Sequence, residues 1–400
     1  MTLDPEKVRA AYPALAEGFA LFDGAGGSQT AEPVIAAIAA TMRSAVSNRG
    51  AVSAPARRSG EIVAAAREAV ADLVGGDPRG VIFGPSATAL TYLASRTLAQ
   101  GWGAGDEVVV TRLDHDSNVR PWVQAAGQAG ASVRFAEVDL STGELPVEQF
   151  RELIGDRTRL VAVTAASNAI GTAPAVRRIA DLAHAAGALV YVDGVHATAH
   201  LPTDVRELGA DFFVTSAYKW SGPHYAALVA EPALLDELHP VKLLPSPAWA
   251  PDRFEYGTLS FELLAGMTAA VDHLAGLAPS GAADRRGRVL ASLGAVAAYE
   301  KGLAAKLSAG LTAHDAVTVL KAPDGGCPTI SFRIAGQAPA DTARLLGDRG
   351  VCVSSGDYYA AEYFIAAGLR ESGGAVRASI YHYNTAEEVD RLLEAVAALA

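Results

Sequence analysis

Two charged residues of this 400-residue chain stand at the ends of apolar, strand-like stretches. Asp193 closes the stretch "ALVYVD", and Lys219 follows "DFFVT" after three intervening residues. A carboxylate at the end of a buried strand is costly unless it meets a cation or a hydrogen-bond donor. A lysine in such a place is often only a solvated surface charge, but it can also serve as a nucleophile. Asp193 and Lys219 are therefore candidates for catalysis.

Three further stretches place polar residues after a strand pattern. Gly84-Pro85-Ser86-Ala87-Thr88 follows "VIF" and opens a helix, where free N–H groups and the positive end of the helix dipole suit a phosphate. The same pattern also fits an ordinary helix cap. The other two stretches carry His115 and Asn168.

The elements that would position these residues alternate between strand and helix. Strands are expected at residues 80–84, 107–111, 159–167, 188–193 and 211–215, with helices at 61–75, 88–100 and 176–187. This alternation predicts an α/β fold whose sheet is largely parallel and covered by helices on both faces. Ligands of such sheets bind at the carboxyl ends of the strands, so these polar residues should meet there.

A change of pattern from about residue 280 suggests a second, smaller domain. A long Ala/Leu helix over 285–307 precedes strands at 317–320, 329–334, 351–355 and 376–381. Thr385 and Glu388 fit a capping box at the start of the last helix.

Composition excludes several classes of function. Half of the residues are apolar and the formal net charge is −11, with no dense cluster of lysine and arginine, so nucleic acid and anionic membranes are not expected as partners. The N-terminus does not resemble a signal peptide, and no uncharged run is suited to span a membrane. Cys327 and Cys352 lack the spacing of a metal site, so we expect no metal and a cytoplasmic protein.

The polar residues together match the chemical groups of pyridoxal phosphate, which has a phosphate, an aromatic ring nitrogen and an aldehyde. Lys219 would form the Schiff base with the aldehyde. Asp193 would keep the ring nitrogen protonated, and His115 would stack on the ring and could also move protons. These three residues are the predicted catalytic residues.

Seven motifs in order give the chain a resemblance to the class V aminotransferases, most closely to their cysteine desulfurase-like branch. The motifs are "LFDGAGGS", "DHDSN", "SNAIGT", "YVDGVH", "TSAYK", "RFEYGT" and "VRASIYHYNT". The resemblance implies fold type I of the pyridoxal-phosphate enzymes, with a mostly parallel seven-stranded sheet in a large domain and a small C-terminal α/β domain. It places the N-terminal segment at residues 1–20, the large domain at 21–275 and the small domain at 276–400.

The resemblance also implies roles for individual residues. The implied cofactor-binding residues are Ala87, Thr88, His115, Asn168, Asp193, His196, Ser216, Tyr218, Lys219 and Thr258. Thr258 would reach the cofactor of the other subunit in a homodimer. Arg377 would grip the carboxylate of an amino-acid substrate, because a guanidinium binds a carboxylate through two parallel hydrogen bonds.

One departure from the family concerns the nucleophile. Desulfurases carry a loop cysteine where this chain has Tyr359, in the segment "SSGDYYA". Tyr358, Tyr359 and His224 could act as acids or bases or shape the substrate pocket. We therefore expect Cβ elimination, such as C–S lyase chemistry, through an external aldimine and a quinonoid without an enzyme persulfide. Transamination, epimerisation and a desulfurase that uses Cys352 are the alternatives.

Overall fold

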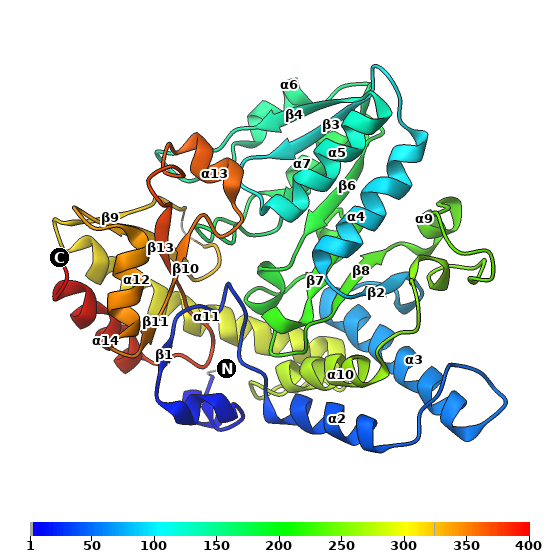
Figure 1. Cartoon of the computed structure of the whole chain (residues 1–400), viewed down its shortest axis with the longest axis horizontal. Helices are drawn as coiled ribbons and strands as arrows, with labels where there is room; N and C mark the ends of the chain where they lie inside the picture. The colour runs from blue at the N-terminus through cyan, green and yellow to red at the C-terminus, as the bar shows by residue number, and fades with distance from the viewer. Residues whose placement is uncertain (1–2, 324) are drawn as a thin grey trace.

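Seven strands form the central sheet of the computed structural model, which describes residues 3–323 and 325–400 (Figure 1). The strands β3, β4, β5, β6 and β7 pair in parallel, and β8 runs antiparallel to both β2 and β7. In spatial order they are β2 (Val81–Gly84), β8 (Ala226–Ala230), β7 (Phe212–Ser216), β6 (Leu189–Asp193), β5 (Thr158–Thr164), β3 (Glu107–Thr111) and β4 (Ser132–Ala136). The predicted mostly parallel seven-stranded sheet is confirmed.

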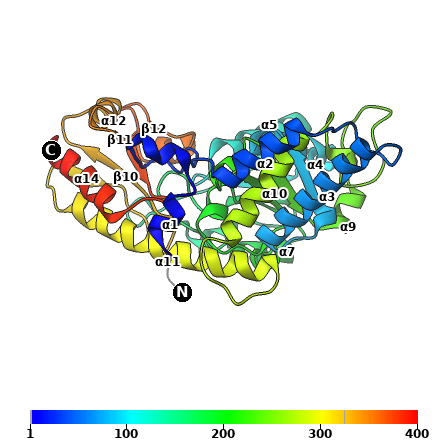
Figure 2. The ribbon, with the colours of Figure 1, turned by 90° about the horizontal axis from the view of Figure 1, so that it is seen from below.

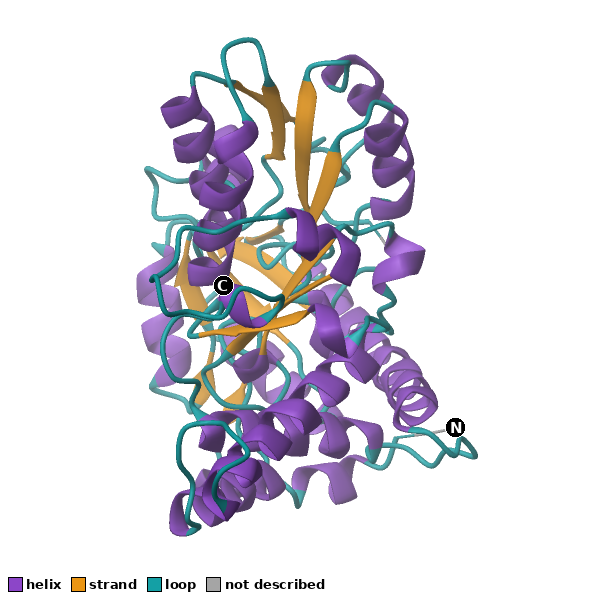
Figure 3. Cartoon of the chain, turned by 90° about the vertical axis from the view of Figure 1, so that its right-hand side faces the viewer, coloured by secondary structure: helices purple, strands orange, loops and turns teal. Residues whose placement is uncertain are grey.

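Helices cover both faces of this sheet (Figure 3). Along β6, Val190 and Val192 face one hydrophobic core while Tyr191 faces another, as the alternation of a strand requires. The first core contains α3 (Ala54–Val74), α7 (Val176–Ala185) and α10 (Phe261–Ala275), and the second contains α4 (Ala87–Leu98) and α5 (Arg120–Ala129). Each strand end is thereby fixed between two packed layers.

A four-stranded antiparallel sheet lies beside the first sheet, in the order β12-β13-β10-β9. Its strands are β12 (Ser354–Gly356), β13 (Ala375–Ser379), β10 (Thr329–Ile334) and β9 (Val317–Val319). The prediction of one continuous strand at 351–355 is wrong. It is divided into β11 (Val351–Cys352), which pairs in parallel with β1 (Ala20–Leu21), and β12, which pairs with β13.

The long helix α11 (Arg285–Thr312) runs along both parts of the molecule (Figure 2). Val289, Leu293 and Val296 in its first half belong to the core of the seven-stranded sheet. Leu303 and Leu307 belong to the core of the four-stranded sheet, which α14 (Ala386–Ala397) also covers. Because one helix spans both cores, the predicted domain boundary at residue 275 stays a prediction.

The remaining helices are short or lie at the edges. They are α1 (Pro5–Arg9), α2 (Glu32–Arg43), α6 (Phe150–Leu153), α8 (Val205–Leu208), α9 (Pro232–Glu237), α12 (Pro339–Gly347) and α13 (Ala361–Ala366). Arg9 of α1 forms an ion pair with Glu388 of α14 at 2.9 Å, which joins the chain ends; residues 1 and 2 of the predicted N-terminal segment lie outside the described residues. The capping box of Thr385 and Glu388 is confirmed. Within the described residues, none of the helices combines the length and the apolar character that crossing a membrane requires.

Candidate active site

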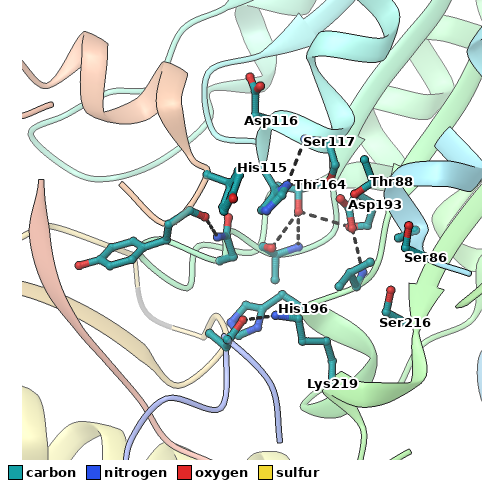
Figure 4. Close-up of a pocket in the computed structure, with 18 of the residues that line it drawn as sticks. Ser86, Thr88, His115, Asp116, Ser117, Thr164, Asp193, His196, Ser216 and Lys219 are labelled. Atoms are coloured by element: carbon teal, nitrogen blue, oxygen red, sulfur yellow. Dashed lines mark hydrogen bonds between the residues drawn. The ribbon is translucent and has the colours of Figure 1, made fainter. Parts of the chain in front are cut away.

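A cavity of about 690 Å³ opens at the carboxyl ends of the parallel strands (Figure 4). Residues at the ends of β2, β3, β5, β6 and β7 line it on one side, and the segment from β12 to α13, together with β13, lines it on the other. The predicted site residues that line this cavity are Ala87, Thr88, His115, Asn168, Asp193, His196, Ser216, Tyr218, Lys219, Tyr359 and Arg377. The polar residues that the sequence places at strand ends therefore do meet at one cavity.

Two predicted site residues lie elsewhere. His224 is exposed and stacks flat on Tyr218, with ring centres 4.7 Å apart and an interplanar angle of 6°. His224 is not among the residues that line the described cavity, although Tyr218 is, so its predicted role in substrate binding stays a prediction. Thr258 is exposed and does not line the cavity of its own chain. Its predicted role across a homodimer stays a prediction.

Lys219 ends the short 3-10 helix η7 (Ala217–Lys219) that follows β7. Its ammonium group donates a hydrogen bond to the carbonyl oxygen of Ala25 and lies 4.9 Å from the centre of the Tyr218 ring. Burial, and then the positive charge of Arg377, lower the pKa of Lys219 to about 7. A substantial fraction of this amine is therefore neutral near pH 7, as a nucleophile or a base must be.

Asp193 is buried at the end of β6, and its Oδ1 accepts a hydrogen bond from the backbone N–H of Val195 at 2.9 Å. Burial raises the pKa of its carboxyl group to about 6, although the nearby Lys219 opposes the shift. Among the described residues, no lysine or arginine forms an ion pair with Asp193. A buried carboxylate of this kind is suited to a cationic ligand group.

A second buried carboxyl group, on Asp114, was not predicted from the sequence. It accepts hydrogen bonds from the hydroxyl of Thr111 and from Nδ2 of Asn118. Burial raises the pKa of Asp114 to about 8, and the charge of Asp193 adds to the shift. At neutral pH Asp114 is therefore mainly protonated. Of the two carboxyl groups that line the cavity, Asp193 is buried, whereas Asp116 forms an ion pair with Arg120 at 2.7 Å.

His115 is held as one tautomer. The backbone N–H of Ser117 donates to Nδ1 of His115 at 3.0 Å, so Nδ1 carries no proton and the proton lies on Nε2. Burial, followed by the charges of Lys219 and Arg377, lowers the pKa of His115 to about 4. The side chain is thus a neutral, flat ring, and the ring of Tyr359 stacks on it with centres 5.5 Å apart.

The end of β2 leads directly into α4, whose first turn lines the cavity. The hydroxyl of Ser86 accepts a hydrogen bond from the N–H of Ala89 and so acts as the helix cap. Thr88 and Ser216 remain as hydroxyl donors beside the free N–H groups of this turn. The arrangement is suited to a phosphate.

Arg377 is a buried cation on β13. Its Nη1 donates to the carbonyl oxygen of Asn168 at 2.9 Å, its Nη2 lies 3.4 Å from Oγ of Ser354, and its Nε has no hydrogen-bond partner among the described residues. Burial lowers the pKa of Arg377 to about 10, so it stays charged at neutral pH. Its open Nε and its place in the cavity suit an anionic ligand.

Asn168 and His196 line the cavity close to Arg377 and the four-stranded sheet. Nδ2 of Asn168 donates to the carbonyl oxygen of Tyr358 at 2.9 Å, and its Oδ1 has no partner among the described residues. Nε2 of His196 lies 2.9 Å from Oγ1 of Thr329, and burial lowers the pKa of His196 well below its usual range. Both side chains are therefore neutral, and Asn168 keeps a free acceptor for a ligand donor.

Tyr358 and Tyr359 close the cavity from a loop with a strained backbone. Their φ angles are 49° and 60°, in the left-handed region that non-glycine residues seldom adopt. The N–H of Asp116 donates to the carbonyl oxygen of Tyr359 at 2.6 Å, and the hydroxyl of Tyr358 donates to the carbonyl oxygen of Ala375. Strain of this kind persists only where the surrounding contacts hold it in place.

Neither cysteine lines the described part of the cavity. Cys352 lies in β11 opposite Leu21, and Cys327 is buried. Burial raises the pKa of both thiols, which lowers the fraction of reactive thiolate.

The polar groups of the cavity fit pyridoxal phosphate. The first turn of α4 suits its phosphate, Asp193 suits a protonated ring nitrogen, Lys219 suits its aldehyde and the free Oδ1 of Asn168 suits its ring hydroxyl. The fit rests on two observations: the buried carboxylate of Asp193 forms no ion pair with a lysine or arginine among the described residues, and the buried Oδ1 of Asn168 has no hydrogen-bond partner there.

Comparison with known proteins points to one family. A sequence model of the family described as aminotransferase class-V matches residues 20–392. The chain is 36% identical to an uncharacterized protein of Mycobacterium tuberculosis over the full length of both. It is 32% identical to a probable cysteine desulfurase of Pseudomonas aeruginosa, over 98% of this chain and 97% of the relative.

Solved structures agree with the sequence relatives. A cysteine desulfurase of Escherichia coli has a TM-score of 0.86 and 27% identity, covering 100% of this chain and 98% of its own. The apo structure of a cysteine desulfurase from Thermococcus onnurineus has a TM-score of 0.89 and 26% identity, with the same coverage.

Proposed function

Because the chain belongs to the aminotransferase class-V family of pyridoxal-phosphate-dependent enzymes, we propose that it eliminates a sulfur substituent from the Cβ atom of an amino acid. The substrate would be cysteine or an S-substituted cysteine. Loss of the α-proton and of the thiolate, followed by addition of water, gives a thiol, pyruvate and ammonia. The observation that carries the proposal is the absence of a cysteine from the described lining of the cavity, where Tyr359 is present instead.

Each residue of the cavity has a place in this reaction. Lys219 would carry the cofactor, Asp193 would meet its ring nitrogen, and Thr88, Ser216 and the first turn of α4 would hold its phosphate. When bound, pyridoxal phosphate supplies a sink for the electron pair that the α-proton leaves behind. Arg377 binds and orients the substrate carboxylate.

Proton transfer would depend on Lys219. Its pKa of about 7 allows the free amine to take the α-proton and later to return a proton at neutral pH. His115 does not compete for this role, because its Nδ1 is occupied by Ser117 and its pKa is about 4. It would pack its flat ring against the bound cofactor, and the ring of Tyr359 stacks on His115.

A desulfurase reaction through Cys352 is the rival that the names of the relatives favour. Such a reaction would need the thiol at the substrate. Cys352 is only half-buried, but it is paired into β11, and burial raises its pKa. The geometry of the chain therefore supports elimination over persulfide formation.

Product analysis separates these reactions. The purified protein is incubated with L-cysteine and with S-substituted cysteines, and pyruvate, ammonia, alanine and thiol are measured. Elimination gives pyruvate and ammonia in equal amounts, and Cys352→Ala leaves the rate unchanged, whereas Lys219→Ala abolishes it. Alanine as the product, together with loss of activity in Cys352→Ala, would establish the desulfurase reaction instead. A keto acid that keeps the substrate side chain would indicate transamination.

A homodimer would complete the site. The segment 241–256 exposes five large apolar side chains: Val241, Leu243, Leu244, Trp249 and Tyr256. An exposed apolar group of this size indicates an interface, and Thr258 lies two residues after it. Light scattering should give twice the mass of one chain. The double variant Leu244→Ser, Trp249→Ser should shift the mass toward one chain, whereas Ile365→Ser on α13 should not.

A further inference from the structure

The hydroxyl of Tyr12 is the centre of a buried polar cluster outside the cavity. It lies 2.7 Å from Oγ of Ser221, 2.8 Å from Nε2 of His382 and 3.0 Å from Nε2 of His273. Tyr12, Ser221 and His382 are buried, and His273 is half-buried. Four separate parts of the chain meet at this one oxygen atom.

Tyr12 has no spare hydrogen-bonding capacity. A phenol has one hydrogen to donate and two lone pairs that accept, so three partners saturate it. Burial raises the pKa of Tyr12 well above its usual range, and burial lowers the pKa of His273 to about 4. Burial also lowers the pKa of His382. The cluster is therefore neutral at pH 7, and its hydrogen bonds are directional contacts rather than ion pairs.

Ser221 joins this cluster to the loop that presents Lys219. It lies two residues after the lysine and has a φ of 65°, a conformation that serine seldom adopts. Its N–H donates to Oγ of Ser28 at 2.8 Å, and its hydroxyl also contacts the hydroxyl of Tyr381 at 2.9 Å. Such a backbone conformation persists only where several contacts hold it.

The other side of the lysine loop is held by the segment around Ser28. The hydroxyl of Ser28 donates to the carbonyl oxygen of Tyr218 at 3.0 Å, and Lys219 itself donates to the carbonyl oxygen of Ala25. The backbone on both sides of Lys219 is thus fixed by residues distant in sequence. Tyr12 itself lies in the N-terminal segment, and its hydroxyl joins the lysine loop to His382 in the turn after β13 and to His273 in α10.

We propose that Tyr12 is a positioning residue for Lys219, acting through the hydrogen bond between its phenol and Ser221. The proposal rests on the assignment of Lys219 as the residue that carries the cofactor, but not on which reaction follows. None of the described residues before Ala25 lines the cavity. The proposal nevertheless gives the N-terminal segment a role, because Tyr12 helps to hold the amine of Lys219 in place.

Hydrogen–deuterium exchange of the cofactor-loaded full chain tests the proposal. Tyr12→Phe removes one hydroxyl and keeps the ring. Of the three hydrogen bonds that this variant removes, only the one to Ser221 reaches the lysine loop. We therefore expect amide exchange in residues 216–224 to become about tenfold faster, the effect of losing one buried hydrogen bond, and the cofactor to dissociate faster. Tyr299→Phe is the matched control, because its hydroxyl donates to the carbonyl oxygen of Asn384 at 2.7 Å and does not touch the lysine loop. It should leave exchange in 216–224 unchanged.

Ser221→Ala removes the same hydrogen bond from its other end, together with the contact to Tyr381, and keeps the phenol of Tyr12. It should accelerate exchange in the same residues, and the double variant should add little to either single variant. Unchanged exchange in 216–224, or an equal rise in Tyr299→Phe, would overturn the positioning role. If Tyr12→Phe does not fold, Ser221→Ala alone decides the outcome. A wild-type protein that holds the cofactor but eliminates no thiol would contradict the proposed reaction and leave this test intact.

Discussion

The guanidinium carbon of Arg377 lies 4.4 Å from the centre of the Tyr358 ring. The ring supports the buried cation without neutralising it, because an aromatic face attracts a positive charge but carries no net charge. No carboxylate forms an ion pair with Arg377 among the described residues. Burial lowers the pKa of Arg377, and the charge of Asp23 opposes this shift without an ion pair between them, so the Nε of Arg377, which lacks a partner in the described chain, can still bind an anionic ligand.

Arg377→Lys should raise KM for the amino-acid substrate by about tenfold to a hundredfold, because lysine cannot form two parallel hydrogen bonds with a carboxylate. The change in kcat should be smaller if the lost contact is made equally in the bound and transition states. Arg333→Lys is the control, since Arg333 lies on the neighbouring strand β10 and its contacts are with Ser372 and the carbonyl oxygen of Gly374. Steady-state kinetics with both variants check this expectation, and an unchanged KM in Arg377→Lys would refute it.

Asp193→Asn should stabilise the cofactor-free protein at pH 8. The folded pKa of about 6 lies above the ordinary value of 3.8, so the ionised form is disfavoured in the fold. Stability from this group is therefore highest at low pH and is lost as the pH rises from about 4 to about 6. Asparagine removes that loss, which amounts to roughly 3 kcal/mol at pH 8. Denaturant unfolding should show a smaller gain at pH 5.

The same substitution should lower activity, because an amide cannot hold the ring nitrogen protonated. Asp114→Asn is the informative comparison. It removes a carboxyl whose pKa of about 8 is also raised by burial, but Asp114 does not line the cavity in the described structure. It should stabilise the protein at alkaline pH with a weaker effect on activity. Equal loss of activity in both variants would contradict the separate roles.

Two variants should shift the pKa of Lys219 in opposite directions. Arg377 lowers that pKa and Asp193 raises it, so Arg377→Met should move it up from about 7 and Asp193→Asn should move it down. The midpoint of the pH dependence of Lys219 acetylation, followed by mass spectrometry on the cofactor-free protein, measures each shift. If both variants shifted the pKa of Lys219 in the same direction, Arg377 and Asp193 would not have opposite electrostatic effects on this amine.

The sequence predicted the strand ends more reliably than the complete sheet. The stretches that end in Asp193 and Thr215 are rich in valine, tyrosine and phenylalanine, and both are strands in the structure. Strands β4 (Ser132–Ala136) and β8 (Ala226–Ala230) were not identified individually, because "SVRFA" is partly exposed and "AALVA" is rich in alanine, which favours strands little. Their place depends on the neighbours that pair with them.

Site residues that belong to a local sequence motif were predicted. Contacts between residues far apart in the sequence were missed. Asp193 ends a strand, and His115 and Lys219 each follow one, so their convergence could be inferred from the fold class. Tyr12 meets Ser221 across 209 residues and His382 across 370 residues, and no local pattern indicates such contacts. Ser86 illustrates an alternative that the sequence left open, since its hydroxyl caps α4 instead of being free for a phosphate.

Tyr359→Gly should raise the pKa of His115 with little change in stability. The φ of 60° costs a tyrosine about 1 kcal/mol, and glycine removes this cost. The stacking on His115 that is lost is worth a similar amount, about 1 kcal/mol. The two effects nearly cancel, and Tyr359 is 72% exposed, so little burial is lost.

The pKa of His115 should respond because burial is the main cause of its low value of about 4. Removing the ring that covers His115 admits water, which favours the charged imidazolium and moves the pKa up toward 6.5. Histidine NMR titration measures the shift, with the His115 signal assigned from His115→Gln. His273 serves as an internal control, because its pKa is also about 4 and it packs against Tyr12 rather than Tyr359. A His115 pKa that stays near 4 would show that Tyr359 does not shield the ring from water.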